Sequence, residues 1–129
     1  MSRKRTSAPL VFTTTDFFGN LVNLQQDRWV GHIISEHPEM TGYETLVKGV
    51  VEAPREVQVS TQEETGLAFI SDPGVGPRPE GIRVLVSYAD THYEKGSTSG
   101  MITTAYPIDI QKYRRPRLGR TIYKKGGRR

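Results

Sequence analysis

The chain has 129 residues, of which 35% are hydrophobic and 25% are charged, and it contains no cysteine. That length supports one domain built around one core, so a multidomain enzyme is not expected. The lack of cysteine excludes disulfides, a thiol nucleophile, an iron–sulfur cluster and cysteine-based zinc sites. Because the sequence has no run of eighteen or more apolar residues, we expect no membrane span and a cytoplasmic protein.

The net charge of +4 conceals two oppositely charged parts. Segment 16–109 holds all fourteen acidic residues and six basic ones, which gives it a charge of −8. The other twelve basic residues lie at the ends, three in 3–5 and nine in 112–129. We therefore divide the chain into a basic extension at 1–7, a single domain at 8–111 and a basic tail at 112–129.

The basic tail has two interpretations. In the first, it anchors the protein to RNA, because each neutralised phosphate releases counterions and interleaved tyrosines stack on bases. In the second, it is a solvated tail, or a strand ending that packs on the acidic domain and neutralises it. Under the first interpretation, the RNA-binding residues are Arg114, Arg115, Arg117, Arg120, Lys124 and Lys125.

The first expected element is a hairpin. Segment 10–18 is rich in β-branched and aromatic residues, and the turn dipeptide Gly19-Asn20 separates it from the apolar run 21–25.

Two helices are expected next. Asp27 is the predicted N-cap of a short amphipathic helix that ends before Pro38. The apolar stripe of segment 43–53 predicts a second helix, which Pro54 stops.

After the second helix the hydrophobic pattern changes from helical to strand-like. Four β-prone runs follow, separated by loops rich in glycine, proline and polar residues, at 55–60, 66–71, 82–89 and 100–108. Consecutive strands after two helices predict an α+β fold, in which both N-terminal helices pack on one face of an antiparallel sheet.

Three histidines are present, His32, His37 and His92. On a regular helix the first two lie about 140° apart, and the sequence has no HExxH motif, so we predict no metal site. His37, at the helix end and facing the sheet, is placed for general acid–base catalysis, or is a structural histidine bonded to a carbonyl of the turn. His32 forms an i, i+4 pair with Glu36 on the helix surface.

Hydroxyl groups cluster on the last predicted strand. Thr104 and Tyr106 are two residues apart, so they share one face of the strand, and Thr103 points to the other. A hydroxyl pair on a sheet face can donate hydrogen bonds to a phosphate or an oxyanion. The alternative is that these residues are present as good strand formers.

Short motifs occur in a fixed order over residues 16–110: Trp29-x-x-His32-Ile33, His37-Pro38-Glu39, Ala53-Pro54-Arg55-Glu56-Val57 and Thr104-Ala105-Tyr106. In order and spacing they resemble the phage-associated nuclease-like domains of the barnase–EndoU–colicin–RelE group. This resemblance implies a small metal-independent RNA-cleaving domain, in which one or two helices pack on an antiparallel sheet of four or five strands.

The same resemblance implies that His37 acts as acid or base and that Thr104 and Tyr106 line its cleft. A cation is also needed at the phosphorane, and run 66–71, where such domains often place one, has none. The remaining candidates for this cation are Arg83, Arg55, Arg114 and Arg115.

We therefore expect an endoribonuclease-like toxin or phage-related effector that needs no cofactor or metal. Its expected substrate is RNA, with tRNA as a candidate, and its candidate partner is a cognate antitoxin or immunity protein. The alternative is a non-catalytic nucleic-acid- or protein-binding module of the same fold, anchored by its basic tail. A structural or assembly protein is a third reading. The predicted catalytic residues are His37, Tyr106, Thr104, His32 and Arg83.

Overall fold

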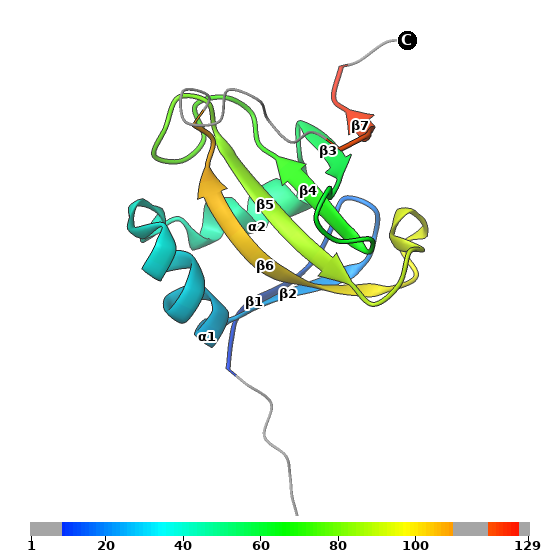
Figure 1. Cartoon of the computed structure of the whole chain (residues 1–129), viewed down its shortest axis with the longest axis horizontal. Coiled ribbons are helices and arrows are strands. Elements are labelled where there is room, and N and C mark those ends of the chain that lie inside the picture. Colours follow the sequence, from blue (N-terminus) through cyan, green and yellow to red (C-terminus); the bar gives the residue numbers. More distant parts are fainter. Residues whose placement is uncertain (1–8, 110–118, 127–129) are drawn as a thin grey trace, which may run out of the picture.

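The computed structural model describes residues 9–109 and 119–126, and a seven-stranded sheet forms its centre (Figure 1). The strands are β1 (Leu10–Thr15), β2 (Leu21–Gln25), β3 (Glu56–Val59), β4 (Gly66–Ile70), β5 (Ile82–Tyr88), β6 (Ser99–Pro107) and β7 (Thr121–Lys124). The α-helices are α1 (Gln26–Arg28) and α2 (Glu44–Glu52). A π-helix, η1 (Trp29–Ile34), follows α1, and two 3-10 turns are η2 (Pro38–Met40) and η3 (Tyr93–Lys95).

The fold is α+β, but the expected antiparallel sheet of four or five strands is wrong. The strand order is β1-β2-β6-β5-β4-β3-β7, and β2 pairs with β6 in parallel. The hairpin β1–β2 is therefore part of the sheet. Val22 and Leu24 of β2 are buried in the same core as Ile102 of β6, so the hairpin must join the sheet to bury them. A parallel pairing between distant segments leaves no local sequence signal.

The main core lies between the sheet and α2, which is behind the sheet in Figure 1. On β5, Val84 and Val86 are buried against this core and alternate with partly exposed residues. We call the opposite face, which carries Arg83, Leu85 and Ser87 of β5, the front face. The second predicted helix is confirmed as α2.

The first predicted helix differs from expectation in form and position. It is three residues of α-helix followed by the π-helix η1, and η1 contacts β6. Trp29 and Ile33 reach the core, whereas His32 reaches a pocket on the front face. The prediction that both helices pack on one face is therefore wrong. Because β2 pairs only with the start of β6, the later part of β6 leaves an open edge, and η1 lies along it.

A segment of the basic tail belongs to the sheet. β7 pairs antiparallel with β3, with Tyr123 opposite Val57 and Lys124 opposite Glu56. The strand interpretation of the tail therefore applies at Thr121–Lys124. No helix within the described residues is long and apolar enough to cross a membrane.

A buried polar cluster closes the β1–β2 turn. The carboxylate of Asp16 accepts hydrogen bonds from the backbone N–H groups of Phe18 and Asn20, at 2.8 and 2.9 Å. The hydroxyl of Tyr88 donates to the same carboxylate at 2.5 Å, and the Asn20 amide donates to the Tyr93 carbonyl at 2.6 Å. Burial, together with the hydrogen bond and charge of Asp16, raises the pKa of Tyr88 well above its ordinary value. The cluster ties the hairpin to β5 and η3.

Candidate active site

The candidate site lies on the front face of β5 and β6, where β6 departs from regular pairing. Leu85 pairs with Thr104 and Val86 pairs with Ile102, so Thr103 is the extra residue of a β-bulge. Its hydroxyl donates a hydrogen bond to the Leu85 carbonyl at 3.3 Å. Thr103 and Thr104 therefore line one pocket. The prediction that Thr103 faces the other way is wrong, because side-chain alternation is interrupted at a bulge.

Three of the predicted residues meet at one end of this face. The rings of His37 and Tyr106 have centroids 5.4 Å apart and planes tilted by 37°. Arg83 donates a long hydrogen bond of 3.4 Å from Nη1 to the Tyr106 hydroxyl, and its Cζ lies 6.0 Å from the ring centroid. Within the described residues, the buried Nε of Arg83 has no hydrogen-bond partner. An imidazole, a phenol and a guanidinium thus lie side by side.

The backbone around His37 fixes where its ring points. Its N–H donates to the Ile33 carbonyl at 2.7 Å, and its carbonyl accepts from the N–H of Met40 at 2.9 Å. Pro38 begins η2 directly after it. In the part of the chain that the structure describes, the imidazole contacts Tyr106 and makes no hydrogen bond. The alternative of a structural histidine bonded to a carbonyl of the turn is therefore not observed, and neither ring nitrogen has a hydrogen-bond partner among residues 9–109 and 119–126.

Two histidines reach the same strand because their helix is not regular. Regular winding would place His32 and His37 about 140° apart. The π-helix η1 has wider turns, which i→i+5 hydrogen bonds close. As a result, His32 lines the pocket beside Thr104, while His37 contacts Tyr106. The predicted pair of His32 with Glu36 is confirmed, with 3.7 Å between Nδ1 and Oε2.

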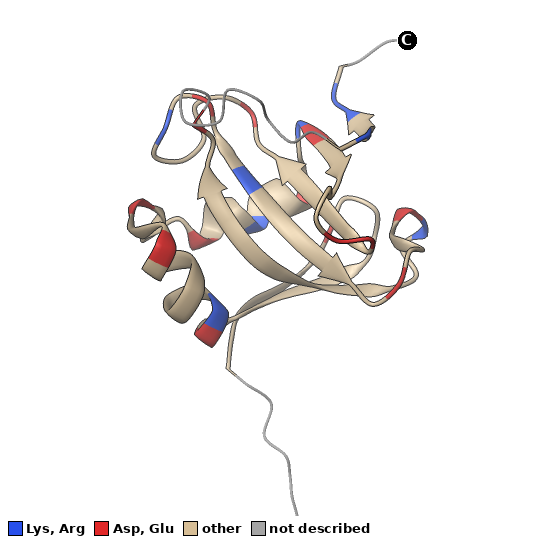
Figure 2. Cartoon of the chain, in the orientation of Figure 1, with Lys and Arg blue, Asp and Glu red and all other residues tan. Residues whose placement is uncertain are grey.

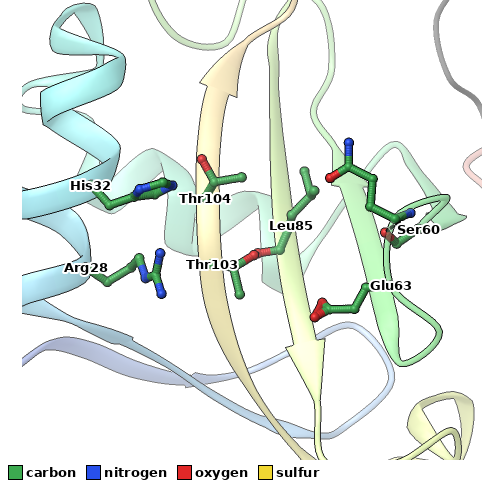
Figure 3. A pocket seen from close by; sticks show the side chains of 8 residues that line it. Arg28, His32, Ser60, Glu63, Leu85, Thr103 and Thr104 are labelled. Carbon is green, nitrogen blue, oxygen red and sulfur yellow. Dashed lines mark hydrogen bonds between the residues drawn. The ribbon is translucent and has the colours of Figure 1, made fainter.

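A pocket of about 290 Å³ opens beside this cluster, between the helix side and the β3–β4 loop (Figure 3). The helix side contributes Arg28 and His32, and the loop contributes Ser60, Gln62 and Glu63. Sequence reasoning missed Arg28 and all three loop residues. Arg28 precedes His32 by four positions, and that spacing on a helix was a usable signal. The loop residues belong to no motif.

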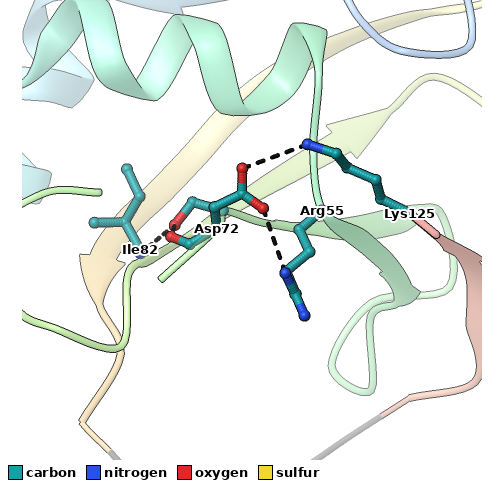
Figure 4. Close-up of polar contacts among 5 residues, drawn as sticks. Arg55, Asp72, Ile82 and Lys125 are labelled. Carbon is teal, nitrogen blue, oxygen red and sulfur yellow. Dashed lines mark hydrogen bonds and ion pairs between the residues drawn. The ribbon is translucent and has the colours of Figure 1, made fainter. Parts of the chain in front are cut away.

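The predicted RNA-binding residues of the tail do not gather at this site. Three of them lie outside the described residues, namely Arg114, Arg115 and Arg117. Arg120 and Lys124 are exposed at the β7 edge, four strand spacings or about 19 Å from β6. Lys125 Nζ lies 3.6 Å from Asp72, whose other oxygen lies 3.6 Å from Arg55 Nη1 (Figure 4). Of the candidate cations, Arg55 is therefore paired away from the site and Arg83 is in it.

The site combines few charges with several hydrogen-bonding groups. β5 and β6 carry one charged residue between them, Arg83, and the acidic residues lie mostly on helices and loops around them (Figure 2). A histidine can transfer a proton at this position, and a guanidinium can stabilise an anionic phosphorus centre. Among the described residues, no group of three metal-ligating side chains comes together.

Comparisons with protein-family models, curated proteins and solved structures found no match to this chain. The resemblance to the nuclease-like family therefore rests on the order of the sequence motifs. The functional assignment rests on the geometry of the site.

Proposed function

We propose that this protein is a small endoribonuclease that cleaves RNA without a metal ion, by general acid–base catalysis. The observation that carries the proposal is the contact among His37, Tyr106 and Arg83, which are far apart in the sequence. Acid–base groups must reach one phosphate through hydrogen bonds or a single water, and the 5.4 Å between the ring centroids of His37 and Tyr106 supports a shared site for these two residues.

In the proposed reaction, the ribose 2′-oxygen attacks the adjacent phosphorus as the P–O5′ bond breaks. The products are a 2′,3′-cyclic phosphate and a 5′-hydroxyl. A base must remove the 2′-OH proton, and an acid must protonate the leaving 5′-oxygen. His37 fills one of these roles, and His32, which lines a pocket with Thr104, is available for the second. Arg83 and the Tyr106 hydroxyl stabilise the negative charge on the phosphorane.

The resemblance to phage-associated nuclease-like domains supports a role as a toxin or phage-related effector that acts in the cytoplasm. On the same ground, tRNA is a candidate substrate and a cognate antitoxin or immunity protein is the candidate partner.

Cleavage of total RNA and tRNA in the presence of EDTA tests the proposal. His37→Ala is expected to slow cleavage by about 10²- to 10⁴-fold, because it removes a proton-transfer group. Tyr106→Phe and Arg83→Gln should also slow cleavage while leaving the fold intact by circular dichroism. His92→Ala is the matched control, since this histidine is 63% exposed and pairs with Asp90 on a loop.

Two results would contradict the proposal in different ways. Cleavage by His37→Ala at the wild-type rate removes His37 from the mechanism. Salt-sensitive RNA retention by a wild-type protein that does not cleave supports the alternative, a binding module of the same fold.

A further inference from the structure

We propose that the pocket of Arg28, His32 and Glu63 binds one nucleotide of the RNA and selects a base that carries an exocyclic amino group. This inference rests on the proposed function, and it adds two specificity residues, Arg28 and Glu63, which line one pocket with the proposed proton-transfer residue His32. The pocket volume of about 290 Å³ is at the lower end of the range for ligand sites, which suits a ligand of this size.

The pocket has two chemically different ends (Figure 3). Arg28 and His32 lie at the helix end, where the guanidinium of Arg28 can hold a phosphate through two parallel hydrogen bonds. Ser60 and Glu63 lie at the loop end, on the far side of Leu85. A nucleotide that spans the pocket has its phosphate toward the helix and its base over Leu85, with the base edge toward the loop.

The exposed carboxylate of Glu63 accepts a hydrogen bond from the sheet before any ligand binds. Ser87 of β5 donates a hydrogen bond from its hydroxyl to Glu63 Oε2 at 3.1 Å. The loop is closed by hydrogen bonds from the Ser60 N–H to the Gly66 carbonyl, at 2.9 Å, and from the Gly66 N–H to the Glu63 carbonyl, at 3.1 Å. A Cβ at Gly66 would lie 3.0 Å from Ser60 Cβ and 3.2 Å from Glu63 Oε1, so glycine leaves room for both of these side chains.

A carboxylate in this position distinguishes bases by their hydrogen-bond donors. An ionised glutamate only accepts hydrogen bonds, and adenine, cytosine and guanine each present an exocyclic amino group that donates them. Uracil has no amino group; its base-edge donor, N3–H, is recessed between two carbonyl oxygens, which repel a carboxylate that approaches it. Glu63 therefore favours the amino-bearing bases.

The pocket adjoins the catalytic cluster along β5. Arg83 and Leu85 are successive residues on the front face, about 7 Å apart along the strand. On β6, Thr104 lines the pocket and Tyr106 contacts His37. A phosphate next to the bound nucleoside is therefore presented to the residues proposed to cleave it.

Equilibrium binding of AMP, CMP, GMP and UMP, each titrated alone by calorimetry, tests this proposal. We expect UMP to bind at least about tenfold more weakly than the other three, from the value of one specific base contact. Glu63→Gln should remove most of that difference, since an amide both donates and accepts hydrogen bonds. Glu64→Gln, a change at the neighbouring exposed carboxylate, should leave the order of affinities unchanged.

The proposal is overturned if the protein binds none of the four nucleotides, if UMP binds as tightly as the others, or if Glu63→Gln keeps the wild-type order. The assay needs no cleavage, so its outcome is separate from that of the proposed function. Selective binding by a protein that does not cut RNA would refute the nuclease and keep the pocket. Cleavage that depends on His37, together with equal binding of all four nucleotides, would support the nuclease and refute the base selectivity of the pocket.

Discussion

Replacing Tyr88 with phenylalanine removes one hydrogen bond from the buried cluster at the β1–β2 turn and keeps the ring. Tyr88 is 4% exposed, and its hydroxyl donates to Asp16 Oδ2 at 2.5 Å. A hydrogen bond to a charged group contributes about 1.5–3 kcal/mol. Because Asp16 keeps its other donors, Phe18 and Asn20, we expect Tyr88→Phe to lower the free energy of unfolding by about 2 kcal/mol near neutral pH.

The same substitution changes how stability depends on pH. The pKa of Tyr88 is raised in the folded protein, first by burial and then by Asp16, so the folded state keeps a proton that the unfolded chain loses above about pH 10. The contribution of Tyr88 is therefore complete below about pH 10 and declines as pH rises further. For one group the decline approaches about 1.4 kcal/mol per pH unit. Tyr88→Phe should remove this part of the slope.

Urea denaturation at several pH values from 7 to 11, followed by circular dichroism, measures both effects. Asp16→Asn serves as the second variant, because it removes the charge and leaves Tyr88 buried, so most of the slope above about pH 10 should remain. If Tyr88→Phe unfolds with the wild-type midpoint and the wild-type pH slope, then the buried hydrogen bond does not stabilise the turn and our reasoning is refuted.

Two further predictions concern the helix and the tail. Ile33→Ala should lower the free energy of unfolding by about 2–5 kcal/mol in urea denaturation, because the Ile33 side chain of η1 is fully buried in the core, and a loss under 1 kcal/mol would contradict this packing. The double change Arg120→Gln and Lys124→Gln should reduce the slope of log affinity for single-stranded RNA against log salt by about 1.4, if both exposed side chains contact phosphates. Binding titrations at four salt concentrations measure that slope, and an unchanged slope would exclude this edge from the RNA interface.

The local elements of the fold were predictable because each depends on neighbouring residues. The hairpin β1–β2 follows from a turn dipeptide between β-prone runs, and α2 follows from an apolar stripe that ends before Pro54. The pairing of β2 with β6 and of β7 with β3 depends on contacts between distant segments. The alternation of apolar and polar residues indicates a strand but not the strand with which it pairs. The seven-stranded mixed sheet could therefore not be derived from the sequence.

The candidate site shows the same division between residue type and placement. His37, Tyr106 and Arg83 were each proposed from their chemistry, but their contact depends on the register of β5 against β6. The bulge at Thr103 and the π-helix that turns His32 toward β6 both break the regular geometry on which spacing arguments rely.

The charges around the pocket indicate why the Glu63 carboxylate favours a ligand that donates hydrogen bonds. Within the described residues, three acidic side chains form ion pairs with lysine or arginine, namely Glu52, Asp72 and Asp109. Glu63 has no ion-pair partner among the described residues, and its carboxylate accepts a hydrogen bond from the neutral hydroxyl of Ser87. A ligand that covers this carboxylate takes it out of water, which costs free energy unless the ligand donates hydrogen bonds in return. Because uracil offers a single donor that lies between two carbonyl oxygens, we expect that cost to fall mainly on uracil, so that Glu63 acts more by rejecting uracil than by attracting the other bases.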